Sequence, residues 1–252
     1  MKTRFGDRLM YIGGEFVASE SGEWMESVNP ATEEVHGRVP AGTAADVDRA
    51  VQAALKAQEA WAKVSVWERG EIIRKLAAAI VARADEIVAL EAADTGNTIA
   101  SLGGDIHLAK GYLNFVAGLG IEIKGESVPA TVENIHFTMR EPYGVVGRIV
   151  PFNHPFLFAA AHLAAPLIAG NAVILKSPDQ SPLSASLMAE ICHEVLPPGL
   201  VNIVHGQGMV VGDAIVRHKK IHRIGFTGSV GTGMAIQRAA AEVAVKHLSL
   251  EL

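Results

Sequence analysis

The polar residues best suited to chemistry in this sequence stand at the ends of apolar runs. Asn153 lies in the turn Pro151-Phe152-Asn153-His154-Pro155, directly after the apolar run 145–150, and Lys176 follows the apolar run 172–175. Ligands of open parallel sheets bind outside the carboxyl ends of the strands, so both side chains are placed where a ligand is expected. The Asn153 amide could donate a hydrogen bond to a developing oxyanion. The alternative, an asparagine that only shapes a turn, is the commoner case.

Glu251 stands in a third apolar run, Leu248-Ser249-Leu250-Glu251-Leu252. A carboxylate surrounded by apolar residues would have a raised pKa and could serve as a general base. Taken in isolation, a strand residue that faces solvent is the better interpretation.

A glycine-rich stretch, Phe226-Thr227-Gly228-Ser229-Val230-Gly231-Thr232-Gly233, joins a predicted strand to a predicted helix. Glycines let the backbone approach a ligand, and a helix N-terminus offers free N–H groups to phosphate. The Ser229 hydroxyl could add a contact, although a bare turn explains the stretch equally well. A second glycine pair, Gly206-Gln207-Gly208, follows another predicted strand, and Gly212 comes soon after.

Asp179 is separated from Lys176 by Ser177-Pro178. An acidic residue just past a strand can accept hydrogen bonds from ribose hydroxyls, and it repels a 2′-phosphate. Asp179 could equally be an acid that stabilises a helix N-terminus.

Cys192, the one cysteine, borders an apolar helical stripe, which predicts a core thiol. His193 is its neighbour in sequence and points elsewhere on a helix, so the two do not form a dyad. A single cysteine also excludes an internal disulfide and a cysteine-rich metal site, and we expect no metal.

The elements that must position these residues alternate regularly after Tyr143. We predict strands at 145–150, 172–175, 201–204, 222–226 and 247–252, and helices at 156–168, 183–195, 209–217 and 231–241. Four such crossovers predict a Rossmann-like α/β fold, in which a parallel sheet is covered by helices on both faces.

The first 120 residues predict short strands followed by a helical layer. The strands are expected at 10–12, 15–18 and 24–28, between turn signals. One helix begins at Thr43, with Asp46 as a capping-box partner, and others cover 67–82, 84–93 and 102–119. We interpret all of these helices as scaffold.

The segment 121–142 predicts a β-hairpin arm. Ile135, Phe137 and Met139 alternate with polar residues, and Ile121-Glu122-Ile123 could pair with them. The hairpin could be an arm for contact between subunits or an ordinary surface hairpin, and the sequence does not separate the two.

The bulk composition narrows the class of protein. The chain has 252 residues, 49% of them hydrophobic, and a formal net charge of -5. No basic run exceeds Lys219-Lys220, so no nucleic-acid partner is expected. The N-terminus lacks the apolar core of a signal peptide, and the longest apolar run is too short to span a bilayer. We therefore expect a cytoplasmic protein with no membrane contact.

Several motifs in their joint order resemble the aldehyde dehydrogenase superfamily. They are Glu141-Pro142-Tyr143-Gly144-Val145-Val146-Gly147, the Pro151–Pro155 turn, Gly170-Asn171-Ala172-Val173-Ile174-Leu175-Lys176, Pro197-Pro198-Gly199-Leu200-Val201-Asn202-Ile203-Val204, Phe226-Thr227-Gly228-Ser229 with Gly233, and Leu250-Glu251-Leu252. The resemblance covers the whole chain and includes Asp94-Thr95-Gly96. It implies oxidation of an aldehyde to a carboxylic acid with NAD or NADP, through a cysteine thioester. It also implies a homodimer or homotetramer.

The resemblance assigns roles residue by residue. Asn153 would hold the oxyanion of the thiohemiacetal, and Glu251 would activate water. Lys176 would bind the adenosine ribose beside Asp179, which stands where the family usually has Glu, and Ser229 would contact the pyrophosphate. The remaining implied cofactor contacts are Ile149, Val150, Pro151, Phe152, Ser177, Gly208, Gly212, Phe226, Thr227, Gly228, Gly233 and Leu252.

Two local departures from the family pattern concern the cofactor and substrate sites. The family's usual aromatic-rich turn, Pro-Trp-Asn-Phe-Pro, is replaced here by Pro151-Phe152-Asn153-His154-Pro155, which alters the wall of the cleft. Asp179 is shorter than the usual Glu, so we expect NAD as the preferred cofactor and keep NADP as the alternative.

The C-terminal end is the larger departure. The chain stops at Leu252, where the family continues with two glycines and later a nucleophilic cysteine. We therefore expect residues 1–120 and 143–252 to form the cofactor-binding domain and 121–142 an oligomerisation arm, with the catalytic domain absent and this chain alone inactive.

Three alternatives stay open. One is a non-catalytic, nucleotide-binding paralogue of half length. Another is a relative that makes acyl-CoA or acyl-phosphate, against which Glu251 argues. The third, a Rossmann reductase, is disfavoured because neither a GxGxxG motif nor a catalytic Tyr-x-x-x-Lys motif is present. The residues do not identify the aldehyde.

Overall fold

The computed structural model describes residues 5–252 and is built around one seven-stranded sheet. The order of its strands is β11-β10-β7-β8-β9-β1-β2. These strands are β1 (Met10–Ile12), β2 (Glu15–Val17), β7 (Val145–Ile149), β8 (Ala172–Lys176), β9 (Val201–Val204), β10 (Ile221–Thr227) and β11 (His247–Glu251). Strands β7 to β11 pair in parallel, as predicted, whereas β1 pairs antiparallel with β9 and β2. The antiparallel edge was not part of the prediction.

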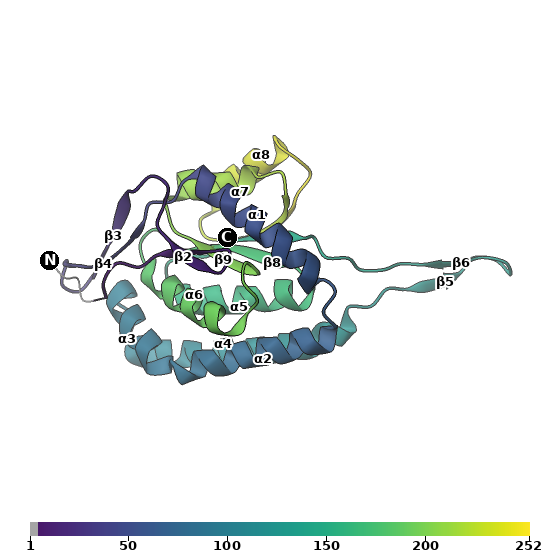
Figure 1. The fold of residues 1–252 in the computed structure, drawn as a ribbon, viewed down its shortest axis with the longest axis horizontal. Coiled ribbons are helices and arrows are strands. Elements are labelled where there is room, and N and C mark those ends of the chain that lie inside the picture. Colours follow the sequence, from purple (N-terminus) through teal and green to yellow (C-terminus); the bar gives the residue numbers. More distant parts are fainter. Residues whose placement is uncertain (1–4) are drawn as a thin grey trace.

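Helices cover both faces of the sheet, which confirms the predicted α/β architecture (Figure 1). Helices α5 (Pro155–Ile168) and α6 (Leu183–Val195) pack on one face, and α1 (Ala44–Trp61), α7 (Asp213–Arg217) and α8 (Val230–Ala241) lie on the other. Every residue of β8 is buried as a result. Strands covered on both faces read as continuous apolar runs, and the first four residues of β8, 172–175, do so.

The predicted N-terminal helical layer is divided between the two faces. Helices α2 (Val66–Ala82), α3 (Ala84–Thr95) and α4 (Ile99–Leu119) form an outer layer over α5 and α6. Helix α1 instead contacts β8 and β9 directly. The predicted capping box at its start is present, since Thr43 and Asp46 bond reciprocally.

The hairpin arm exists, but its predicted pairing is wrong. Residues 121–123 do not form the partner strand, because Gly120–Glu122 is a 3₁₀ turn that continues α4. Strand β6 (Ile135–Phe137) pairs with β5 (Ser127–Pro129). The close packing of Gly120 on Val66 and Ile168 keeps the chain on the body of the protein at this point. The two strands then extend away from the body (Figure 1).

Two further predictions need correction. Strand β4 (Val35–Pro40) was not predicted, and it pairs with β3 (Trp24–Val28) in a separate two-stranded sheet. The helix predicted at 209–217 is two elements, a π-helical turn at Gly208–Gly212 and then α7. Glycine at both ends of the wide turn weakens the α-helical preference, and π turns occur often at functional sites.

Among the described residues, no helix combines the length and the apolar character needed to cross a bilayer.

Candidate functional site

The carboxyl ends of β7, β8, β10 and β11 bring most of the predicted site residues to one edge of the sheet. Ile149 is the register partner of both Lys176 and Phe226, and Thr227 pairs with Glu251. Residues separated by about a hundred positions in the sequence therefore stand on adjacent strands. This placement follows from the parallel topology.

Lys176 is the buried cation of this edge. Its side chain is only 3% exposed, and Nζ donates to an Asp179 carboxylate oxygen at 2.5 Å and to the Ser177 carbonyl at 2.7 Å. Burial lowers the pKa of Lys176, and the neighbouring Asp179 carboxylate opposes this effect. The second Asp179 oxygen accepts from the Gly208 N–H at 2.9 Å. Asp179 thus joins the end of β8 to the π-helical turn.

The π-helical turn lies close to the ends of β7 and β8. A side-chain carbon built on Gly212 would lie 3.8 Å from Lys176 and 4.0 Å from Ile149, so these three predicted residues are neighbours. Beneath them, the Ser177 hydroxyl contacts His205 Nδ1 at 2.8 Å. Burial and the nearby Lys176 lower the pKa of His205 to about 3, so the imidazole is neutral near pH 7.

The glycine-rich stretch forms the junction of β10 and α8, as predicted. Ser229 caps α8, because its hydroxyl accepts from the Thr232 N–H at 3.3 Å. The helix N-terminus at Ser229 is exposed, and a side-chain carbon on Gly231 would meet no atom within 4 Å. Free N–H groups and the positive end of the helix dipole make this end suitable for phosphate.

Glu251 and Leu252 lie beside this junction. The Gly228 N–H donates to the Glu251 carbonyl at 3.0 Å, and the Thr227 hydroxyl donates to the Glu251 carboxylate at 3.1 Å. Glu251 is exposed, which confirms the interpretation of a solvent-facing strand residue. A side-chain carbon on Gly233 would lie 2.5 Å from the end of the exposed Leu252 side chain, which would have to move aside.

His162 on α5 is a half-buried histidine near Arg148 that sequence reasoning missed. Burial and the positive charge of Arg148 lower its pKa to about 4, against an opposing effect of Glu251. Its Nδ1 is buried without a hydrogen-bond partner in the described chain. The position of His162 inside an apolar helical run did not indicate its place near Arg148 and Glu251, because histidines also occur inside protein cores.

The turn that carries Asn153 is held through its main chain. The Ser181 hydroxyl donates to the Phe152 carbonyl at 2.9 Å, and Asn97 Nδ2 donates to the Asn153 carbonyl at 2.6 Å. The Asn153 side chain itself is exposed and is not engaged in these contacts. The turn thereby presents the Asn153 amide at the edge of the sheet.

Two acidic side chains from the outer helices hold the same turn from below. Asp105 Oδ2 lies 2.6 Å from His154 Nδ1, and Glu91 Oε1 accepts from the Phe156 N–H at 2.9 Å. Glu91 is 1% exposed, and burial raises its pKa to about 8. These helices, which the sequence indicates as scaffold, thus also hold the turn that carries Asn153. The available signal was Glu91 itself, a carboxylate four residues after Ile87 on the buried stripe.

Replacing Asn97 by Ala is expected to loosen the turn without unfolding the protein. The lost hydrogen bond is worth about 1 kcal/mol, so amide hydrogen exchange at residues 152–154 should accelerate roughly fivefold. Asn134→Ala, at the tip of the hairpin arm, is the matched control and should leave this exchange unchanged. Unchanged exchange in Asn97→Ala would show that the Asn97 contact does not order the turn.

Cys192 is a core thiol, as predicted. It is 0% exposed on α6, and burial raises its pKa. The nucleophile in enzymes is the thiolate, which a buried apolar environment disfavours. Cys192 therefore takes no part in the edge described above.

The chain matches known proteins over nearly its full length. A model of the group described as the aldehyde dehydrogenase family matches residues 16–252. Aldehyde dehydrogenase tropH of Talaromyces stipitatus is 38% identical over 246 residues, which cover 96% of this chain and 47% of the fungal protein. The chain thus spans about half the length of the curated relatives it matches.

Solved structures give the same result. An NAD⁺ complex of aldehyde dehydrogenase from Bacillus cereus has a TM-score of 0.94 at 38% identity, covering 98% of this chain and 51% of that one. An NADP-dependent enzyme of E. coli has a TM-score of 0.95 at 28% identity, with 98% and 52% covered.

Proposed function

Because the chain belongs to the aldehyde dehydrogenase family, we propose that it forms the cofactor-binding side of an enzyme that oxidises an aldehyde to a carboxylic acid with NAD(P)⁺. The family match confirms the resemblance that the motifs indicated. The observation that carries the proposal is the shared sheet edge, to which the strands bring Lys176, Glu251 and the turn of Asn153, and at which α8 begins with an exposed N-terminus.

The residues at this edge fit a dinucleotide. The α8 N-terminus offers N–H donors to a pyrophosphate, the buried Lys176 amine offers a donor to ribose hydroxyls, and Ile149 offers apolar surface. Pro151, Phe152 and Val150 continue the same wall by their position after β7. When bound, the nicotinamide would accept the hydride of the oxidation.

Asn153 and Glu251 would perform the protein's part of the reaction. The exposed Asn153 amide would donate to the aldehyde oxygen as that atom gains negative charge, from a turn already fixed by Asn97 and Ser181. The Glu251 carboxylate would take a proton from water, held in orientation by the Thr227 hydroxyl. Cys192 does not supply the thiolate that would attack the aldehyde and form the thioester, since its thiol is buried.

NAD is the preferred cofactor in this proposal. A carboxylate at Asp179, next to the ribose-binding amine, would repel a 2′-phosphate. Asp179 is already engaged with Lys176 and Gly208, so its charge is partly balanced, and NADP remains a permitted second cofactor. The likeness to both an NAD⁺ complex and an NADP-dependent enzyme supports naming both.

Assembly and location are further parts of the proposal. The hairpin arm leaves the body with Ile135 and Phe137 about 70% exposed, which supports a homodimer or homotetramer built through residues 121–142. A free, buried Cys192 is compatible with the reducing cytoplasm. The substrate in this proposal is a small aldehyde.

The second candidate is a nucleotide-binding protein without catalysis, since within residues 5–252 the one cysteine, Cys192, is buried and offers no thiolate. Two measurements on the purified chain test both candidates. Isothermal titration calorimetry with NAD and NADP is expected to show saturable binding, with circular dichroism on the same sample to verify folding. Absence of saturable binding by a folded chain would contradict both candidates. Aldehyde-dependent formation of NADH would exclude the non-catalytic one.

A further inference from the structure

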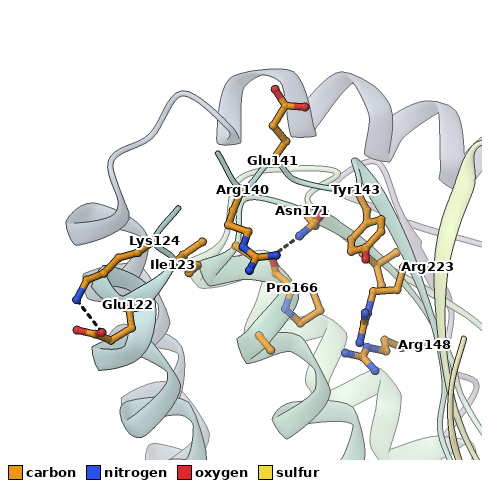
Figure 2. A pocket seen from close by; sticks show the side chains of 13 residues that line it. Glu122, Ile123, Lys124, Arg140, Glu141, Tyr143, Arg148, Pro166, Asn171 and Arg223 are labelled. Carbon is orange, nitrogen blue, oxygen red and sulfur yellow. Dashed lines mark hydrogen bonds and ion pairs between the residues drawn. The ribbon is translucent and has the colours of Figure 1, made fainter. Parts of the chain in front are cut away.

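A cavity of about 370 Å³ opens at the amino ends of β7, β8 and β10, the edge opposite Asn153 and Lys176 (Figure 2). Its wall is formed by the segment that follows the hairpin arm, by the end of α5 and by the starts of these strands. Four cationic and two anionic side chains line it, in a chain whose formal net charge is -5. The cavity lining thus has a net positive charge, whereas the whole chain has a net negative charge.

Three of the cations, Arg140, Arg148 and Arg223, have no carboxylate partner among the described residues. The fourth, Lys124, is paired with Glu122 at 2.8 Å. Glu141 is exposed. Arg223 Nη1 lies 3.5 Å from His247 Nδ1, which brings no negative charge. Guanidinium groups that face one cavity without a carboxylate repel each other, and the entry of an anion would relieve this repulsion.

Arg148 and Arg223 lie close together at the inner end of the cavity (Figure 2). Arg148 Nε is buried and has no hydrogen-bond partner in the described chain. Burial and the charge of Arg223 lower the pKa of Arg148, against smaller opposing effects of Tyr112 and Glu251. The Arg223 guanidinium lies 5.6 Å from the centre of the Tyr143 ring, so that ring restrains its position.

The rest of the wall is largely apolar. Ile123, Val146, Ala165, Pro166 and the ring of Tyr143 contribute to it. An inorganic ion would leave this surface without contacts, whereas an organic anion would cover it while its charged end meets the guanidinium groups. Planar guanidinium groups match the planar carboxylate in a bidentate arrangement.

We propose that this cavity is a binding site for a small organic carboxylate, with Arg148 and Arg223 as its anchors and Arg140 at its mouth. The anchors are held before the ligand arrives, Arg223 by Tyr143 and Arg148 by burial beneath α5. The proposal does not depend on the oxidation proposed above, because the carboxylate would bind at the amino ends of the strands and the cofactor at their carboxyl ends.

Calorimetric titration of the 252-residue chain with sodium succinate, against sodium chloride at equal ionic strength, tests the proposal. Saturable binding is expected, and Arg223→Gln should weaken it about tenfold or more, as the loss of a charge-assisted hydrogen bond predicts. Arg140→Gln serves as a second variant at an exposed position. Arg238→Gln, an exposed arginine on α8 outside the cavity, is the matched control and should leave the affinity unchanged.

Thermal unfolding of the same variants is a second test, which stays informative if a substitution changes the stability of the protein. Without ligand, Arg223→Gln should unfold at a higher temperature than the wild type, because it relieves the repulsion with Arg148. The rise in midpoint that succinate gives the wild type should be lost. No saturable heat, or equal affinity in the wild type, Arg223→Gln and Arg140→Gln, would overturn the proposal. Inorganic phosphate that bound as tightly as succinate would show selection of charge alone and would overturn the carboxylate assignment.

Discussion

Glu91→Gln is expected to remove a large part of the pH dependence of unfolding between about pH 4.5 and about pH 8. The carboxyl is almost fully buried beneath the turn that carries Asn153, and burial raises its pKa to about 8, with Asp105 and Asp94 adding to the rise. The folded protein therefore keeps a proton that the unfolded chain releases near pH 4.5. Stability from this group is complete below about pH 4.5, falls as the pH rises to about 8, and is constant above that.

The expected size of this effect is roughly 3–5 kcal/mol at pH 9, which makes it the largest single change considered. Glutamine keeps the oxygen that accepts from the Phe156 N–H and stays neutral at every pH, so the variant should be the more stable protein at high pH. Urea unfolding of both proteins from pH 5 to pH 9 measures the difference directly.

The difference between the two unfolding curves cancels the other titrating groups. Glu194→Gln, an exposed glutamate on α6, is the control and should follow the wild type at every pH. If the free energy of unfolding changed with pH in the same way in the wild type and in Glu91→Gln, Glu91 would already be ionised in the folded protein. The prediction of a buried, protonated Glu91 beneath the Asn153 turn would then be wrong.

Lys176→Met is expected to lower the affinity for NAD by roughly 10- to 100-fold. The amine is the buried cation of the carboxyl-end edge and stands 3 residues before Asp179, which holds it. Methionine fills a similar volume but removes every donor hydrogen, so the ribose hydroxyls would lose a charge-assisted bond. Calorimetric titration with NAD measures the change.

Lys220→Met is the control for this experiment, because Lys220 is an exposed lysine before β10, outside the edge. It should bind NAD as the wild type does. Wild-type affinity in Lys176→Met would contradict the assigned role of Lys176. Equal loss in both variants would trace the effect to net charge.

The local elements of this protein could be predicted from residues close together in the sequence. The alternation of apolar runs after Tyr143 predicted every parallel strand, and Thr43 with Asp46 marked the start of α1. Cys192 was assigned to the core from its helical stripe, and it is fully buried. Periodicity reports which side of an element avoids water, and that property is local.

Errors arose where a contact with a distant segment decided the local structure. Residues 121–123 favour a strand, but the packing of Gly120 against Val66 and Ile168 continues the helical path of α4. The turn at Gly208–Gly212 winds as a π-helix where its first N–H is held by Asp179.

By itself, the sequence determined the order of the strands and helices, the capped helix starts and the family motifs, because these depend on neighbours within a few residues. Only the tertiary structure decided that Glu91 and Asn97 hold the Asn153 turn, that Lys176 meets Gly212, and that unpaired arginines share a cavity. Those contacts join segments tens of residues apart. Their energies come from burial and the proximity of charges, which exist only once the segments have packed together.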